Sequence, residues 1–441
     1  MTRNWQKLIG RAAAFLLIVL TSSAGLPAYS VLTHEEFIDL LWPDEIRPLV
    51  LHRFPGLTDD QMKEAHAYAY GGSVIQDLGY YPFGSKYFSD LVHYVRSGDF
   101  VRELLIESQD ANEYAFALGA LSHYVSDIDG HPAVNQAVAI QYPKLRMKYG
   151  PSVRYAQDKT AHLKTEFGFD TLQVAKNRYA PEQYHDFIGF QVSTPLLERV
   201  FPVVYGLPLK DVLTHEDLAV GTYRWAISRL IPEMTQVALQ THKKELVKET
   251  PGFAKKKFLY HLSRSDYERY WGKGYTKPGA GTRILAFFLK LVPKVGPFKG
   301  LGFNNPTPKT EDMYIKSINT TVDDYRTLLR EVGKSKLALP NCDLDSGNAT
   351  KAGEYTLTDE TYANLLAKLT ASKFEGTSPE LRDNILAFYA DQSAPIETKK
   401  NAGQWQAVQS NLNELKAAAT TTVSAPRTDS SRVASRADSI Q

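Results

Sequence analysis

The chain has 441 residues, of which 43% are hydrophobic and 11% aromatic, and this composition excludes a mostly disordered protein. Its 51 Lys and Arg residues nearly balance its 49 Asp and Glu residues, so no basic excess marks it as a binder of duplex DNA. The single cysteine, Cys342, excludes an intramolecular disulfide and a cysteine-based metal site. Any metal site in this chain must therefore be built from His, Asp and Glu.

The N-terminal segment has the three-part layout of a secretory signal peptide. Three basic residues precede an apolar run at 12–20, and small residues follow up to Ala28. The alternative is an uncleaved membrane anchor, but the run is well short of the about 20 residues that span a bilayer. We expect removal of residues 1–28 and export to the periplasm or the extracellular space. The segment carries three basic and no acidic groups, so the mature chain is close to neutral.

From residue 31 to about residue 247, apolar residues recur at three- and four-residue spacing, which is typical of helices packed in a protein. Few alternating β-branched runs interrupt this pattern. We therefore predict an all-α fold, a multi-helix bundle that forms one domain over residues 29–250. The strongest turn signals in this domain include Gly71-Gly72 and Gly130.

The rest of the chain divides into a C-terminal region at 251–415 and a tail at 416–441. Apolar patterns at 311–332 and 358–374 predict helices, so we expect a smaller, mainly helical extension of unknown role. The apolar run at 284–297 contains lysines and is either a lipid-facing insert or a buried connector helix, the second being favoured. The tail is poor in large apolar residues, so we expect it to be disordered.

The sharpest polar motif joins His123 and Asp127, which are four residues apart in an apolar stretch. On a helix both side chains lie on one face, with Cβ atoms about 5–6 Å apart, so they can share a metal ion. Gly130 is predicted to end the helix and to let His131 fold back towards this pair. A His/Asp pair of this spacing is more often simply exposed on a helix. A buried and unpaired ionisable group is costly, however, and zinc suits His and carboxylate ligands.

Other candidates repeat this combination of imidazole and carboxylate. His162 and Glu166 are also four residues apart, in a predicted helix that Asp158 can cap. Asp77 follows the glycine turn, and His93 lies in the next predicted helix. Taken alone, Asp77 is also interpretable as a helix or turn cap, and His93 as a core histidine. These residues therefore indicate a metal site only when they are considered together.

His34 lies a few residues beyond the predicted cleavage point, where a surface position on an N-terminal helix is its alternative interpretation. With the other candidates it forms an ordered set, within residues 31–247, that resembles the bacterial zinc-dependent phospholipases C. That family shares an all-helical fold with the single-strand-specific zinc nucleases, so the resemblance implies the same type of helical bundle. The set consists of His34, Asp77, His93, His123, Asp127, His131, His162 and Glu166.

The resemblance implies a cluster of two or three zinc ions in one cleft. The first ion would be held by Asp77, His93, His123 and Asp127. The second would be held by His131, His162 and Glu166. The third would be shared by His34, Asp127 and the backbone of the mature first residue, which is Tyr29 if cleavage follows Ala28.

The chain departs from the family pattern in four places, one of which is a longer stretch than usual between His131 and His162. The interval between Asp127 and His131 is two residues shorter than usual, and no tryptophan stands near the expected mature N-terminus. The family's toxin members dock on membranes through a C-terminal β-sandwich, and residues 255–420 show no such strand pattern. The resemblance therefore does not imply membrane attack like theirs.

The resemblance implies a secreted zinc-dependent phosphodiester hydrolase, in particular a phospholipase C. A metal-bound hydroxide would attack phosphorus in line and release diacylglycerol and a phosphorylated head group. Asp77 would serve as a metal ligand or as general base on a second water. The expected partners are a phospholipid or other phosphodiester and a peripheral membrane surface, without a stable nucleic-acid complex. The alternatives are a zinc-dependent nuclease or other phosphodiesterase, and a non-catalytic helical binding protein stapled by zinc.

Overall fold

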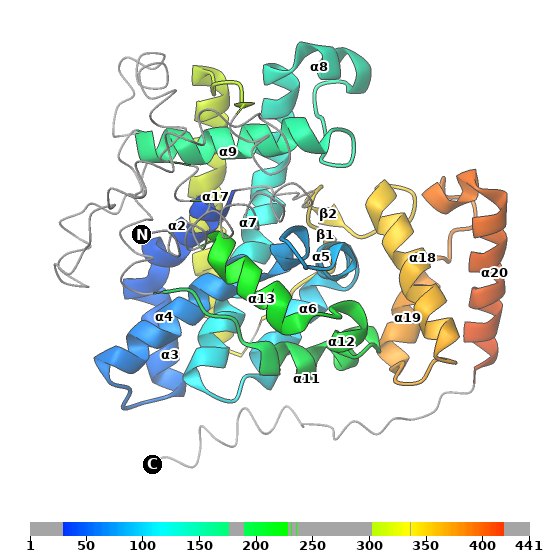
Figure 1. The fold of residues 1–441 in the computed structure, drawn as a ribbon, viewed down its shortest axis with the longest axis horizontal. Coiled ribbons are helices and arrows are strands. Elements are labelled where there is room, and N and C mark those ends of the chain that lie inside the picture. Colours follow the sequence, from blue (N-terminus) through cyan, green and yellow to red (C-terminus); the bar gives the residue numbers. More distant parts are fainter. Residues whose placement is uncertain are drawn as a thin grey trace, which may run out of the picture.

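The computed structural model describes residues 30–175, 189–227, 231, 235, 302–335 and 337–418, and it confirms the mainly helical fold (Figure 1). The N-terminal elements are α2 (Val31–Leu41), η1 (Trp42–Ile46), α3 (Arg47–Arg53), α4 (Asp59–Ser73), η2 (Ile75–Tyr80), α5 (Lys86–Tyr94), α6 (Ser97–Glu107), α7 (Ala111–Gln141), α8 (Pro143–Tyr149), α9 (Lys159–Ala175), α11 (Thr194–Tyr205), α12 (Leu209–Val212) and α13 (Glu216–Trp225). The C-terminal elements are α17 (Pro308–Gly333), β1 (Cys342–Asp343), β2 (Asn348–Ala349), α18 (Thr356–Ala371), α19 (Pro379–Phe388), η6 (Glu397–Lys400) and α20 (Ala402–Ala417).

Helix α7 is the centre of the fold. Helices α4 and α17 make the most extensive contacts with it, and α6 and α9 also pack against it. Most of its residues are buried, because its own Ala, Leu, Val and aromatic side chains lie on all sides of the helix. A helix that is apolar all round belongs in a protein core. The candidate ligands His123, Asp127 and His131 on α7 are therefore held inside the bundle.

Glycines allow α4 and α7 to approach closely. A Cβ atom on Gly72 would lie 1.9 Å from the carbonyl oxygen of Phe116, and one on Gly119 would lie 2.1 Å from that of Ala69. The turn predicted at Gly71-Gly72 is wrong, because both glycines belong to the last turn of α4. Glycine is needed there for contact between two helix backbones, and not for reversal of the chain. This contact fixes the end of α4, from which the chain enters η2.

We expect the substitution Gly119→Ala to lower the free energy of unfolding by about 1–3 kcal/mol or more, because the added methyl group overlaps the backbone of α4. The matched control is Gly221→Ala, since a Cβ atom on that helical glycine meets nothing within 4 Å. The control should be neutral, or more stable by up to about 1 kcal/mol because alanine favours the helix. Denaturant unfolding of both variants measures the difference. Equal stabilities would show that the close approach of α4 and α7 is not important.

Helix α7 does not end at Gly130 as the sequence predicts but continues through Pro132. His131 therefore does not fold back. It lies one helical turn beyond Asp127 and on the same face. Pro132 has no N–H for the carbonyl group of Ile128, so the helix loses one hydrogen bond. Packing of α7 on its neighbours outweighs the local signals of Gly130 and Pro132.

The C-terminal elements complete the bundle and extend it. Helix α17 packs along α7, where the hydroxyl group of Tyr325 donates to the carbonyl oxygen of Leu118 at 2.8 Å. Helices α18, α19 and α20 lie together at one side of the molecule (Figure 1). The helices predicted at 311–332 and 358–374 correspond to α17 and α18.

The sequence analysis does not anticipate the small hairpin formed by β1 and β2. The two strands are antiparallel, and their register pairs Cys342 with Ala349 and Asp343 with Asn348. Each strand has only two residues, which is too short to produce an alternating pattern. The turn of this hairpin nevertheless reaches the candidate site.

Several sequence predictions concern residues that the structure does not describe. The signal segment 1–28, the apolar run 284–297 and most of the tail from 416 lie outside the described residues. They stay predictions, as do the domain boundaries. Of the helices that are described, none is long and apolar enough to span a bilayer.

Candidate metal centre

Five of the predicted ligands come together from four elements of the bundle. His34 on α2, Asp77 in η2 and His93 on α5 face the pair His123 and Asp127 on α7. Each of the five is at most 1% exposed. The spacing of four residues on α7 places its two side chains on one face, as expected from the sequence. The result is a compact polar cluster inside an apolar core.

Asp127 lies in the middle of this cluster. Its Oδ1 atom is 3.6 Å from Nε2 of His34, and its Oδ2 atom is 3.5 Å from Nε2 of His93 and 3.2 Å from Nε2 of His123. Nε2 of His93 is also 3.5 Å from Oδ1 of Asp77. Two ligands of one tetrahedral zinc ion, each about 2.0–2.2 Å from the metal, lie about 3.4 Å apart. The nitrogen and oxygen atoms therefore have the spacing of metal ligands.

The carboxylates of this cluster need a cation. In the described part of the chain, no donor makes a hydrogen bond of normal geometry to either oxygen of Asp77 or of Asp127. A buried carboxylate without such donors is strongly unfavourable, and a divalent cation among the imidazoles and carboxylates removes this penalty. The residues therefore fit zinc. Two overlapping triads bring ligand atoms within 4.8 Å of one another: His34, Asp77 and His123, and His93, His123 and Asp127.

Backbone hydrogen bonds orient two of the imidazoles. Nδ1 of His93 is 2.8 Å from the carbonyl oxygen of Ser89, and Nδ1 of His123 is 3.0 Å from that of Ser73. A carbonyl oxygen only accepts, so each Nδ1 carries a proton and each Nε2 of the neutral ring keeps a lone pair. These two Nε2 atoms are 3.4 Å apart. Facing lone pairs repel unless a proton or a metal ion lies between them.

Ser126 orients the third imidazole. Its Oγ atom is 2.9 Å from Nδ1 of His34 and 3.0 Å from the carbonyl oxygen of His123. Because the hydroxyl group donates to the carbonyl group, Nδ1–H of His34 donates to the hydroxyl oxygen, and the lone pair of the neutral ring lies on Nε2, the atom that faces Asp127. Outer partners of this kind fix the tautomer and orientation of metal-binding histidines. Sequence reasoning missed Ser126, since a serine in an apolar helix carries no distinguishing signal.

Burial and neighbouring charges set the protonation of the cluster. Burial, with the nearby His123, lowers the pKa of His34 well below its usual value, which favours the neutral form that binds metal. Burial alone would also lower the pKa of His93, but contacts with Asp127 and Asp77 raise it well above its usual value. Without a metal, a proton on His93 balances part of the carboxylate charge. Metal binding must displace this proton.

The second predicted set is only partly assembled. The ring centroid of His131 on α7 is 5.7 Å from that of His162 on α9, and Nδ1 of His162 makes a short contact with Glu166. Among the residues that the structure describes, these three do not bring three ligand atoms within 4.8 Å. Burial lowers the pKa of His162 and raises that of Glu166. Burial therefore favours a neutral hydrogen-bonded pair in the absence of metal.

Two more polar residues, which sequence reasoning did not assign to the site, lie on this side of the centre. Asn135 on α7 has its Oδ1 atom 2.7 Å from Nε2 of His162. Asp345, in the turn of the β1–β2 hairpin, has its Oδ1 atom 3.3 Å from Nε2 of His131. Asn135 follows His131 by four residues, so helical spacing could have found it. Asp345 is far away in the sequence, and no local pattern connects it with the other candidates.

Comparison with known proteins identifies the family that this site resembles. Residues 33–214 match the family model described as zinc dependent phospholipase C, which confirms the resemblance over this region. All eight predicted ligands lie inside the matched region, whereas Asp345 lies outside it. No curated protein and no solved structure gave a match.

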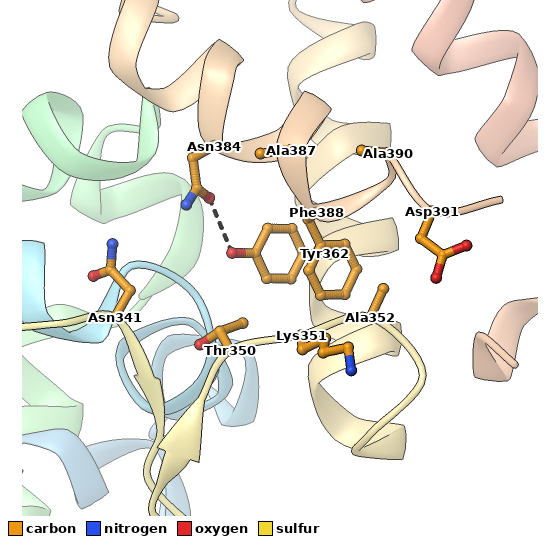
Figure 2. A pocket seen from close by; sticks show the side chains of 10 residues that line it. All are labelled: Asn341, Thr350, Lys351, Ala352, Tyr362, Asn384, Ala387, Phe388, Ala390 and Asp391. Atoms are coloured by element: carbon orange, nitrogen blue, oxygen red, sulfur yellow. Dashed lines mark hydrogen bonds between the residues drawn. The ribbon is translucent and has the colours of Figure 1, made fainter. Parts of the chain in front are cut away.

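A pocket of about 290 Å³ lies between the hairpin region and the helices α18 and α19 (Figure 2). The hydroxyl group of Tyr362 donates to Oδ1 of Asn384 at 2.9 Å, and the ring of Phe388 stacks on that of Tyr362 with centroids 3.7 Å apart. None of the predicted metal ligands lines this pocket. It is therefore not part of the candidate metal centre.

Proposed function

We propose that this protein is a zinc-dependent phosphodiester hydrolase and that it acts as a phospholipase C. The family match over residues 33–214 supports this proposal, as does the buried group of imidazoles and carboxylates at the spacing of zinc ligands. The observation that carries the proposal is the position of Asp127. Its carboxylate lies among three imidazoles and accepts no hydrogen bond of normal geometry from any described residue.

The arrangement of the protein groups suits this chemistry. When bound, zinc would supply a nucleophile from water at neutral pH and stabilise negative charge on the phosphoryl oxygens. Asp127, His93 and His123 would hold the metal, with their rings kept in place by the hydrogen bonds at Nδ1. Burial raises the pKa of Asp77, which makes this carboxylate a better proton acceptor. Asp77 is therefore suited to hold the metal or to act as general base on an attacking water.

The same proposal includes the substrate and the place of action. The substrate would be a phospholipid, cleaved to diacylglycerol and a phosphorylated head group at a peripheral membrane surface. Segment 1–28 would direct the chain to export. Support for these points comes from the family resemblance and from the sequence.

A second candidate function is favoured by one observation. Every residue of the five-residue cluster is buried, and structural zinc sites are closed whereas catalytic sites keep one position open for water or substrate. The cluster would then staple the helical bundle without catalysis. The two functions differ in whether a phosphodiester reaches the metal.

Release of the phosphorylated head group from phospholipid tests the proposal. The mature chain is incubated with mixed phospholipid vesicles, with chelator, and with zinc restored after chelation. Single-stranded DNA is given as a parallel substrate under the same three conditions. We expect lipid cleavage that chelator abolishes and zinc restores.

Other outcomes would contradict the proposal. Metal-dependent cleavage of DNA alone would identify the protein as a nuclease. Tightly bound zinc with neither activity would show that the metal centre is structural.

A further inference from the structure

The turn of the β1–β2 hairpin is docked on the candidate metal centre. The amide of Leu344 donates to the carbonyl oxygen of His93 at 3.1 Å. A Cβ atom on Gly347 would lie 2.7 Å from the carbonyl oxygen of Ile128, which is the carbonyl group that Pro132 leaves without its helical donor. The hairpin therefore lies against both α5 and α7, the two helices that carry most of the imidazoles.

The carboxylate of Asp345 points from this turn into the centre. Asp345 is only 4% exposed. Its Oδ2 atom accepts hydrogen bonds from the hydroxyl groups of Tyr94, at 2.8 Å, and Tyr355, at 2.5 Å. These two donors fix the orientation of the carboxylate. Its Oδ1 atom is thereby directed at Nε2 of His131, 3.3 Å away.

The contact between His131 and Asp345 has the geometry of two metal ligands. Nδ1 of His131 is 3.2 Å from the carbonyl oxygen of Asp127, and this carbonyl can only accept, so Nδ1 carries the proton. Nε2 of the neutral ring then keeps a lone pair, which faces the carboxylate oxygen. Two electron-rich atoms in this position need a proton or a metal ion between them. Their separation matches the about 3.4 Å expected for two ligands of one tetrahedral zinc ion.

We propose that Asp345 is an additional ligand of the metal ion that His131 holds. The proposal rests on the metal centre of the proposed function and adds to it a residue from outside the matched region 33–214. Asp345 gives His131 a second ligand atom at metal-ligand spacing, which neither His162 nor Glu166 is shown to provide. A carboxylate from the C-terminal part of the chain would thus add a ligand to this set.

Asn135 links the hairpin to His162. Its Nδ2 atom donates to the backbone carbonyl oxygen of Asp345 at 3.3 Å, which assigns its Oδ1 atom as the acceptor for Nε2–H of His162 at 2.7 Å. That hydrogen bond leaves the lone pair of His162 on Nδ1, on the side of Glu166. The hairpin therefore supplies one carboxylate ligand and also orients a second imidazole.

The substitution Asp345→Asn tests the assignment. An asparagine keeps the size and can still accept from the two tyrosines, while its amide can donate to His131 and so replaces the anionic ligand atom. The matched control is Asp343→Asn, because Asp343 belongs to the same hairpin and accepts from the hydroxyl group of Thr358. A merely structural role of the hairpin carboxylates would affect both variants equally.

Zinc retention is the readout, measured by metal analysis and by competition with a chromophoric chelator on the full mature chain. We expect Asp345→Asn to lose one zinc equivalent, or to bind it more weakly by a factor above the about 10–100-fold that loss of an outer partner alone costs, while Asp343→Asn retains it. Unchanged zinc binding in Asp345→Asn would overturn the proposal. Equal losses in both variants would also overturn it.

A measurement on the wild-type protein tests the same assignment without requiring that the variants fold. Anomalous diffraction from crystals grown with zinc should show an ion about 2.0–2.2 Å from a carboxylate oxygen of Asp345 and from Nε2 of His131. Zinc at the Asp127 cluster with none beside Asp345 would overturn only this inference. Absence of zinc from both places would overturn the proposed function itself.

Discussion

Asp127→Asn should abolish zinc retention at the cluster and lower phospholipid hydrolysis by about 100-fold or more. Three imidazole nitrogens lie 3.2–3.6 Å from the oxygens of Asp127, so an uncharged amide weakens the contact to any ion that these imidazoles hold. His123 and His131 hold the pKa of Asp127 well below its usual value against the opposing effect of burial. The residue is therefore ionised and ready to bind a cation. Metal analysis and head-group release measure the two effects.

The control for this prediction is Asp129→Asn. Asp129 is on the same helix and mostly buried, and burial together with Asp324 raises its pKa to about 7. The same exchange of carboxylate for amide is thus made two residues from Asp127, on a different face of α7. Asp129→Asn should retain zinc and activity. Full zinc in Asp127→Asn, or equal loss in both variants, would show that Asp127 is not a metal ligand.

Removal of metal should destabilise the whole bundle. The cluster joins α2, η2, α5 and α7, and without a cation it leaves buried carboxylates that lack donors among the described residues. A ligand present at about 1,000 times its Kd stabilises a protein by about 4 kcal/mol, and each kcal/mol shifts Tm by about 2–4 °C in domains of 150–250 residues. We therefore expect chelation to lower Tm by about 10 °C, as measured by thermal unfolding.

Two further measurements define the origin of that shift. Added zinc should restore the original Tm of the wild-type chain. The Asp127→Asn variant should respond much less to chelator, because its cluster has already lost metal. A wild-type Tm that does not change on chelation would contradict a metal centre in the core.

Much of the fold follows from local sequence. The apolar spacing that predicts helices is recovered in α17 and α18, and the cap predicted at Asp158 is present, since its Oδ1 atom accepts from the amide of Ala161 at 2.9 Å. The glycine signals were misinterpreted because glycine serves both turns and close helix contacts. Gly72 lies within α4 at its close contact with α7, and Gly130 lies within α7. A single sequence does not distinguish these uses.

The candidate site was predictable where its residues share a helix. His123 and Asp127 face the same way because of their spacing, and the family resemblance joined them to His34, Asp77 and His93, which the structure places beside them. Asp345 could not be predicted. It reaches His131 only through the hairpin and through the hydroxyl groups of two tyrosines, and tertiary contacts of this kind leave no periodic signal.

Metal analysis of the native chain, purified without chelator and with zinc in the medium, tests the central claim most directly. A buried centre built from His34, Asp77, His93, His123 and Asp127 predicts tightly bound zinc, with two or more ions per chain if the His131 side is also filled. The content should fall to near zero after chelation at acidic pH and return when zinc is added at neutral pH, because protons compete for the imidazoles. A folded chain that binds no zinc under either condition would contradict the metal centre and the function proposed for it.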